Sequence, residues 1–291
     1  MIVSEYLKQQ NVKELTNGKS GADVYLIDDE YILKHVLRNK IEDSVYSMYV
    51  REAMFYQCKK EQDKEYLPDV TYSVFSDDEI IILMKKYAQP DRNKLYKEVI
   101  DNIVKAIVLV HTDDIPEFLT HECEGMSVLT DAEIKEASDG WLSILGEHPG
   151  EFDPSLLEEV ASQINDIITW HNSEEKVLLH GDFHWDNLLM NEDGDILLCD
   201  WQSVKVGGVS EDLSFFLSRL SADGTSIDED YYLDSYAEAY KKESGRDIQV
   251  DSIRKHMKAS NVITTFRFWH RFLHGCDSDT VRDIYEKLRE I

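Results

Sequence analysis

Two carboxylates and one amide occur in a fixed order over a short stretch of the second half of the chain. Asn187 follows Asp182 by five residues, and Asp200 follows Asn187 by thirteen. The apolar runs 188–190 and 196–199 flank a polar turn, so we expect a hairpin that brings Asp200 back beside Asn187. Such oxygens suit Mg²⁺. The spacing therefore predicts a phosphoryl-transfer site, with Asp182 as the catalytic base and Asn187 and Asp200 as metal ligands.

The surrounding motif carries a resemblance to a known family. His180-Gly181-Asp182 through Asn187 resembles the catalytic loop of the aminoglycoside phosphotransferases, which are relatives of the protein kinases. Asp200-Trp201 is similar to the start of the metal-binding motif of the kinases. The resemblance extends roughly from Gly18 to Trp269. It implies a two-lobed, protein-kinase-like α+β fold, Mg²⁺, and ATP or GTP as phosphoryl donor.

The same resemblance identifies residues that would bind the nucleotide. Residues 18–25 are similar to the family's nucleotide loop, and two glycines there would let backbone N–H groups approach phosphate. Lys34 would pair with the α- and β-phosphates, and Glu52 would hold Lys34 by an ion pair. Where the lobes join, the backbone of Lys85 and Tyr87 would bind adenine. The residues implied for the nucleotide are Ser20, Gly21, Ala22, Lys34, Glu52, Met84, Lys85 and Tyr87.

The pattern of apolar residues predicts two lobes. In residues 1–87 we expect strands over 24–27, 31–36, 70–75 and 79–84, with one helix over 45–60. A polar segment with Pro90 follows, as in a linker. Residues 88–291 are predicted to be mainly helical and to hold the catalytic loop and the acceptor pocket. The expected fold has a small antiparallel sheet in the first lobe and a larger helical second lobe.

The motif also departs from the protein kinases. Gly181 replaces the Arg that protein kinases carry before the catalytic Asp. Asp212 follows Asp200 by only twelve residues, which is too short for an activation segment. We therefore expect a small-molecule substrate. By resemblance, Asp212 is structural, and it either caps a helix or ties down the catalytic loop.

The acidic residues are concentrated in the second lobe. The formal net charge is −27, which disfavours nucleic acid polymers and anionic membranes as partners. Residues 1–87 carry 12 Lys+Arg and 16 Asp+Glu, a net of −4, so the rest of the chain carries −23. Residues 111–160 hold 14 acids and one base. These acids either line a pocket for a cationic acceptor or form a solvated surface. Trp269, in an aromatic cluster, would stack on the acceptor, although such clusters also form helical cores.

Histidines and cysteines give little sign of a metal centre. His111 and His171 end predicted helices, where a histidine commonly satisfies the last carbonyls. His184 lies in the catalytic loop and is a candidate to orient it. The cysteines are widely spaced and are predicted to be reduced and mostly buried: Cys58, Cys123, Cys199 and Cys276. With no visible secretory signal or membrane span, the chain is expected to be cytoplasmic, as a monomer or dimer.

These features favour a kinase that transfers the γ-phosphoryl group to a hydroxyl of a small, cationic molecule such as an aminoglycoside antibiotic. Housekeeping kinases of choline, a methylthio-sugar, a fructosamine or homoserine are alternatives within the same class. A non-catalytic, nucleotide-binding pseudokinase is a second class. The presence of Lys34, Glu52, Asp182, Asn187 and Asp200 argues against that class, because a pseudokinase usually lacks one of these residues.

Overall fold

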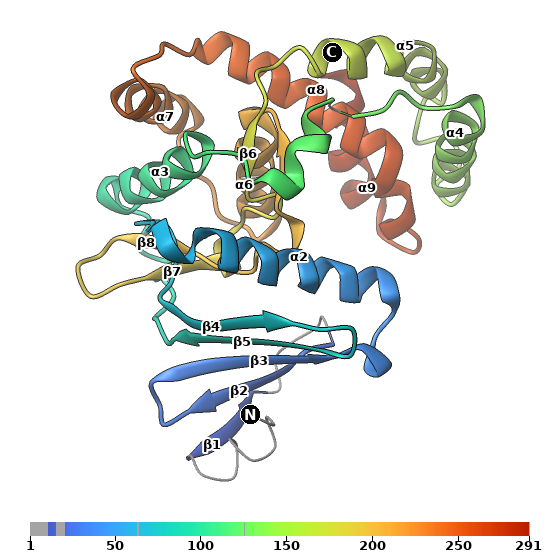
Figure 1. The fold of residues 1–291 in the computed structure, drawn as a ribbon. Helices are drawn as coiled ribbons and strands as arrows, with labels where there is room; N and C mark the ends of the chain where they lie inside the picture. Colours follow the sequence, from blue (N-terminus) through green and yellow to red (C-terminus); the bar gives the residue numbers. More distant parts are fainter. Residues whose placement is uncertain (1–10, 16–20, 63, 125, 291) are drawn as a thin grey trace.

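The N-terminal part of the chain is an antiparallel sheet with one helix across it (Figure 1). The computed structural model describes residues 11–15, 21–62, 64–124 and 126–290. The five strands have the order β1-β2-β3-β5-β4. They are β1 (Val12–Leu15), β2 (Asp23–Ile27), β3 (Tyr31–Leu37), β4 (Val70–Phe75) and β5 (Glu79–Lys85). Both predicted hairpins, β2–β3 and β4–β5, are present.

The sequence explains the first hairpin. Asp28 and Asp29 form its turn with φ of 53° and 60°, a backbone region that Asp tolerates better than most residues and that tight hairpin turns require. In β3, Ile32 and Val36 pack into the core under the helix, whereas Leu33 packs on the opposite face. Because side chains alternate along a strand, Lys34 shares the face of Ile32 and Val36. The alternation therefore directs Lys34 toward the helix.

Helix α2 (Asp43–Lys59) covers this face of the sheet (Figure 1). Tyr49, Glu52, Ala53 and Tyr56 are buried along its inner side at helical spacing. Glu52 is the charged member of this set, and its side chain is fully buried. A buried carboxylate requires a partner, so the packing of α2 prepares the contact with Lys34.

The rest of the chain is mainly helical, as predicted, and lies on the other side of α2 (Figure 1). Its helices are α3 (Lys97–His111), α4 (Asp131–Gly146), α5 (Ser155–His171), α6 (Val209–Ala222), α7 (Glu229–Ser244), α8 (Val250–Phe268) and α9 (Ser278–Tyr285). Short 3-10 turns are Arg38–Lys40, Lys60–Gln62, Glu117–Glu124, Trp185–Asn187, Trp201–Ser203, Trp269–Phe272 and Glu286–Arg289. Two strand pairs complete it, β6 (Val177–Leu179) with β9 (Lys205–Gly207) and β7 (Leu188–Met190) with β8 (Ile196–Leu198).

Two apolar cores hold these elements together. The first runs from the helix side of the sheet through α2 into α3, α6 and α7, and in it Phe55 of α2 stacks on Trp201 at 4.2 Å. The second joins α4, α5, α8 and α9. Phe266 is buried in the second core, whereas Phe268 and Phe272 are exposed. Only part of the aromatic cluster around Trp269 is therefore core.

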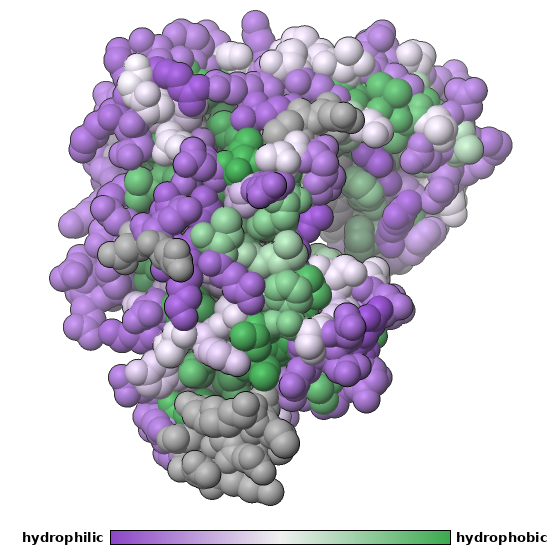
Figure 2. Space-filling model, in the orientation of Figure 1, coloured by the Kyte–Doolittle hydropathy of each residue, from purple (hydrophilic) through white to green (hydrophobic). Residues whose placement is uncertain are grey.

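The surface and the cysteines complete the description. Hydrophilic residues dominate the face shown in Figure 2, with apolar residues in patches between them. Within the part of the chain that the structure describes, no helix is both long enough and apolar enough to cross a bilayer. Cys58 is an exposed free thiol, and the free thiols Cys199 and Cys276 are partly exposed, so the prediction of mostly buried cysteines was wrong for these three. The side chain of Cys123 lies outside the described residues.

Candidate active site

The loop between β6 and β7 depends on a glycine at position 181. Gly181 has φ of 80°, and a Cβ atom there would lie 2.0 Å from the backbone oxygen of Ser203. Other residues rarely adopt this conformation, and the backbone oxygen leaves no room for a side chain. The position therefore has no room for the Arg that protein kinases carry here.

Asp212 ties this loop to α6. Its carboxylate accepts hydrogen bonds from the backbone N–H of His180 at 2.8 Å and of Gly181 at 2.9 Å. The helix begins before Asp212, at Val209, so Asp212 holds the loop and is not the helix cap. His111 lies 3.3 Å from the same carboxylate and 2.8 Å from the hydroxyl of Tyr236. The ring of His111 therefore supports Asp212, and the prediction that it satisfies the end of its own helix was wrong.

Asp182 and Asn187 are in direct contact. The amide nitrogen of Asn187 donates to the backbone oxygen of Asp182 at 2.9 Å and to its carboxylate at 3.2 Å. The ring of His184 lies 3.4 Å from the same carboxylate. Burial alone would raise the pKa of Asp182, but the hydrogen bond and charge of His184, with smaller effects of His180 and Asn187, hold it below its usual value. Asp182 is therefore ionised at neutral pH.

The predicted ion pair between the sheet and α2 is present. The amine of Lys34 lies 2.9 Å and 3.0 Å from the two carboxylate oxygens of Glu52. It also lies 3.2 Å from Asp200, whose backbone has φ of 65°. Burial disfavours the charge on Lys34, but Glu52 and Asp200 outweigh it and raise the pKa of Lys34 above its usual value. Lys34 thus joins the sheet, α2 and the end of β8.

The hairpin returns Asp200 to the catalytic loop. Leu188 of β7 faces Leu198 of β8, and the N–H of Cys199 donates to the backbone oxygen of Asn187 at 3.0 Å. One oxygen of Asp200 accepts from Lys34 and, at 2.5 Å, from the side-chain amide of Gln202. Since the nitrogen of Asn187 is turned to Asp182, its amide oxygen is the atom left to bind a cation. A carboxylate and an amide oxygen in adjacent positions fit the oxygen preference of Mg²⁺.

The other residues predicted for the nucleotide lie at the ends of the sheet. Ser20 lies outside the described residues, as do its neighbours 16–19. Gly21 has φ of 82°, and Ala22 packs against the first core. Met84 is buried, and the N–H of Lys85 already donates to the backbone of Asp69 at 2.9 Å. Tyr87 precedes Ala88, which forms a bridge with Met190 of β7.

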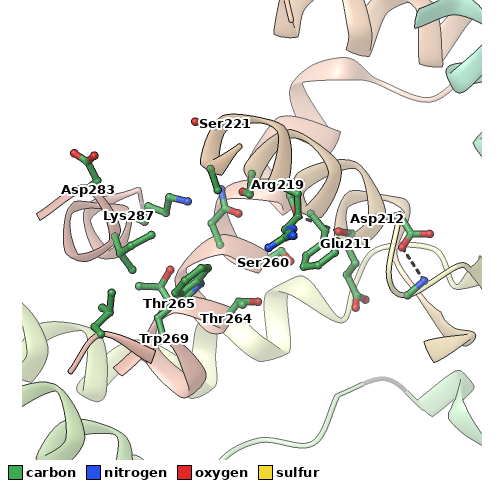
Figure 3. A pocket seen from close by; sticks show the side chains of 18 of the residues that line it. Glu211, Asp212, Arg219, Ser221, Ser260, Thr264, Thr265, Trp269, Asp283 and Lys287 are labelled. Atoms are coloured by element: carbon green, nitrogen blue, oxygen red, sulfur yellow. Dashed lines mark hydrogen bonds between the residues drawn. The ribbon is translucent and has the colours of Figure 1, made fainter. Parts of the chain in front are cut away.

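Beyond the catalytic loop lies a cavity of about 670 Å³ (Figure 3). It is lined by Gly181 and by residues of β9, α6, α8, α9 and the two last 3-10 turns, and Trp269 is part of its wall. Hydroxyl groups dominate the polar lining: Ser214, Ser218, Ser221, Ser260, Thr264, Thr265 and Thr280. None of the described residues of 111–160 lines the cavity. Of the two interpretations of that acidic stretch, this arrangement favours a solvated surface.

The charges in the cavity wall are balanced. Three bases, Lys205, Arg219 and Lys287, and three acids, Glu211, Asp212 and Asp283, belong to the wall. The Nε atom of Arg219 is buried and has no hydrogen-bond partner among the described residues. Burial lowers the pKa of Lys287, although Glu290 and Asp283 oppose this shift. Figure 3 shows both side chains reaching into the cavity, Arg219 from α6 and Lys287 from the C-terminal turn.

Comparison with known proteins identifies the family of the chain. The sequence pattern of the APH family, described as a phosphotransferase enzyme family, matches residues 53–248, which is more than half of the chain. The chain belongs to this family. None of the curated proteins compared matches the sequence of this phosphotransferase.

Solved structures share its fold at low sequence identity. The ADP-bound aminoglycoside phosphotransferase APH(2″)-Ib is 16% identical, with a TM-score of 0.63, over 99% of this phosphotransferase and 96% of that chain. The GDP complex of wild-type aminoglycoside 2′-phosphotransferase-IIIa is 14% identical, with a TM-score of 0.61, over 100% and 95%. A Plasmodium vivax ethanolamine kinase is 13% identical, with a TM-score of 0.61, over 99% and 83%. The predicted two-lobed, kinase-like fold is confirmed.

Several residues around the sites of this phosphotransferase were not found from the sequence. Gln202 bonds Asp200, and its place two residues after a predicted ligand was an available signal. Arg92, in the predicted linker, contacts Asp186 at 2.8 Å and so braces the catalytic loop. Nothing in the sequence indicated that Arg219 and Lys287 line a cavity. Each is an ordinary base on an amphipathic helical segment, and only the packing of the helices places it in the cavity wall.

Proposed function

We propose that this phosphotransferase moves the γ-phosphoryl group of ATP or GTP, with Mg²⁺, to a hydroxyl group of a small molecule bound in the cavity. The observation that carries the proposal is the junction of two sets of contacts. Lys34, Glu52 and Asp200 form one set, and Asp182 and Asn187 form the other. Gly181, the neighbour of Asp182, belongs to the cavity wall. Donor, metal and acceptor sites therefore meet at one loop.

Asp182 is the residue that orients the acceptor hydroxyl. Its depressed pKa keeps it ionised, so that it accepts a hydrogen bond from the hydroxyl and takes up the proton as the new bond forms. Asn187 and Asp200 hold Mg²⁺. The ion, when bound, neutralises charge on the phosphates. Asn187 has a second role, because its amide nitrogen fixes the carboxylate of Asp182.

Lys34 and the segment after β5 bind the nucleotide in this proposal. The pair with Glu52 fixes Lys34 for the α- and β-phosphates. At the adenine, Lys85 offers its carbonyl, since its N–H is already donated to Asp69, and Tyr87 offers its N–H. By resemblance to the family's nucleotide loop, Gly21 and Ala22 would lie over the phosphates, and Ser20 stays a prediction from the sequence. Because similar structures hold ADP, ATP or GDP, both ATP and GTP are candidate donors.

An aminoglycoside-type molecule is the first candidate acceptor. Similar structures were solved with streptomycin and with gentamicin. The cavity has the size of a drug-sized ligand site, and its hydroxyl-rich wall suits a polyhydroxylated ring. Trp269 supplies an apolar surface for stacking.

A metabolite with an anionic group is the second candidate, and the Nε atom of Arg219 in the cavity wall, which is unsatisfied among the described residues, favours it. A polycationic antibiotic would meet Arg219 and Lys287, whereas an acceptor with a carboxylate or phosphate group would pair with them. The excess negative charge of the chain does not extend into this wall, where bases and acids are balanced. A metabolite kinase of the same family would account for both the bases in the cavity wall and the absence of excess negative charge among the described residues there.

A panel of acceptors tests the proposal. Mg²⁺-dependent release of ADP and GDP should be measured with aminoglycosides, with neutral polyols of similar size, and with polyols that carry a carboxylate. We expect at least one acceptor to raise the rate, and Asp200→Ala to abolish the increase. A preference for acidic polyols selects the metabolite kinase, and a preference for aminoglycosides selects the antibiotic kinase. If no acceptor raises the rate and Asp200→Ala leaves basal nucleotide hydrolysis unchanged, the phosphotransfer proposal is wrong.

A further inference from the structure

A cluster of two histidines and a glutamate lies outside the proposed active site. His171 is the last residue of α5, Glu174 follows it in the turn toward β6, and His256 lies in α8. Each residue has one atom that could bind a metal, a ring nitrogen or a carboxylate oxygen, and these three atoms lie within 4.8 Å of one another. In Figure 1, α5 and α8 lie at the end of the helical lobe that is farthest from the sheet. The three residues are thus brought together by packing of the second core, away from the nucleotide residues.

The histidines of this cluster are buried, and three of their four ring nitrogens lack a hydrogen bond among the described residues. His171 is 1% exposed and His256 is 6% exposed. Neither ring nitrogen of His171 has a hydrogen-bond partner among the described residues, and the same is true of Nδ1 of His256. Native proteins rarely leave buried polar atoms unsatisfied, and a bound ion is one of the few explanations. A ring nitrogen of each histidine is thus available to bind a common ion.

The neighbouring side chains fix the orientation of the cluster. Trp170 stacks on the ring of His256 at 4.1 Å, with the two planes 6° apart. Glu174 accepts hydrogen bonds from the N–H of Ser210 at 3.2 Å and from its hydroxyl at 2.5 Å. Glu211 lies 3.7 Å from Nε2 of His171, which is too long for a hydrogen bond but close enough for a further ligand. Such outer contacts orient ligands at metal sites.

We propose that His171, Glu174 and His256 bind a first-row divalent cation, with zinc as the best match. Two imidazoles and one carboxylate are a common zinc set, whereas Mg²⁺ and Ca²⁺ prefer oxygen ligands. A tetrahedral ion with bonds of about 2 Å holds its ligand atoms about 3.3 Å apart, so the ligand atoms, now within 4.8 Å, have to approach one another by up to about 1.5 Å. A cavity of about 180 Å³ reaches Glu174 and His256 and gives the ion a path of entry.

The consequence of binding is structural. The ion would join the end of α5 to the middle of α8, and through Ser210 to the first turn of α6. That turn also contains Asp212, the residue that holds the catalytic loop. The metal site does not depend on the identity of the acceptor or on phosphotransfer. The metal proposal can therefore be wrong while the phosphotransfer proposal is right, and the reverse.

Zinc binding to the full chain tests the proposal directly. After removal of metals with a chelator, the protein is titrated with Zn²⁺ in the presence of excess Mg²⁺, which occupies sites made only of surface carboxylates. Bound metal is counted by elemental analysis, and the thermal midpoint is measured in parallel. We expect one zinc per chain and a rise of the midpoint by about 5 °C at saturation. Less than a third of an equivalent would overturn the site.

Substitutions identify the ligands. His171→Gln, Glu174→Gln and His256→Gln should each weaken zinc binding at least about tenfold, because each removes one bond to the ion. His270→Gln is the matched control, since His270 is also 6% exposed with an unpartnered nitrogen but lies outside the cluster. It should retain full binding. Co²⁺ should give the absorption of a tetrahedral nitrogen–oxygen site in the original protein and lose it in His256→Gln. Equal zinc affinity in the three ligand variants and the control would overturn the proposal.

Discussion

The charged groups around the catalytic loop have partners within the protein, whereas some polar groups in the wall of the cavity have none in the described part of the chain. In the catalytic region, Lys34 contacts both Glu52 and Asp200, and Asp182 contacts Asn187. In the cavity, the buried Nε of Arg219 has no partner among the described residues, and Lys287 is partly desolvated. The first region is satisfied before any ligand arrives, whereas the second leaves polar groups for a ligand to satisfy. Under the proposed function, this difference means that the chemistry is preorganised and that selectivity lies in the cavity.

The largest expected effect comes from the catalytic carboxylate. Asp182→Asn should lower kcat about 10²–10⁴-fold, because the amide cannot accept the proton of the hydroxyl. Nucleotide affinity should stay within about twofold, as the contacts of Lys34 remain. Steady-state kinetics and nucleotide titration measure the two quantities. Asp193→Asn, an exposed change in the turn between β7 and β8, is the control and should leave kcat nearly unchanged. Equal kinetics of the two variants would remove Asp182 from the mechanism.

The rigidity of the catalytic region is tested by two glycines with nearly the same φ. Gly181→Ala and Gly194→Ala both force alanine into the left-handed region, at φ of 80° and 87°, which costs about 1–2 kcal/mol. Only at Gly181 does the added Cβ meet a backbone oxygen, at 2.0 Å, whereas at Gly194 it meets nothing within 4 Å. We therefore expect Gly181→Ala to lose a further 1–3 kcal/mol, roughly, and most turnover. Urea unfolding of both variants measures the difference, and equal losses would show a flexible loop.

The cavity side of the comparison is tested at Arg219. Arg219→Gln should raise the acceptor KM about tenfold, since a hydrogen bond to a charged group contributes about 1.5–3 kcal/mol. The nucleotide KM should not change. Arg282→Gln serves as control, because Arg282 lies on α9, bonds the backbone of Glu151 and is not part of the cavity wall. If both substitutions have the same effect on the acceptor, Arg219 does not contribute to selectivity.

The smallest effect is a pH dependence from Lys287. Burial lowers its pKa from the ordinary 10.5, so Lys287 loses its charge at a lower pH than an exposed lysine does. For an anionic acceptor, kcat/KM should therefore fall a few-fold as the pH rises through the depressed pKa, and binding should be complete below it. Lys287→Arg keeps its charge at all accessible pH values and should remove this decrease. A pH profile with the same decrease in both proteins would assign it to another group.

The sequence predicted the catalytic half of the molecule better than the acceptor half. The hairpins, α2 and the contact between Lys34 and Glu52 follow from alternation and helical spacing, and the structure contains them. The acidic stretch 111–160 indicated nothing about the cavity, because charge counted along a chain does not tell which way helices face. His111 was misjudged for the same reason, since its partner Asp212 is far away in the sequence.

By itself, the sequence determined which polar residues share one loop and hairpin in this phosphotransferase. Asp182, Asn187 and Asp200 lie within one loop and hairpin, where local backbone geometry is enough to bring them together. Only the tertiary structure decided where Arg219, Trp269 and Lys287 meet, and that His171, Glu174 and His256 form one cluster. Apart from His171 and Glu174, these groups come from segments far apart in the chain. Their proximity arises because apolar helix faces pack together. Hydrophobic packing does not depend on the distance between residues along the chain, so no spacing in the sequence could predict it.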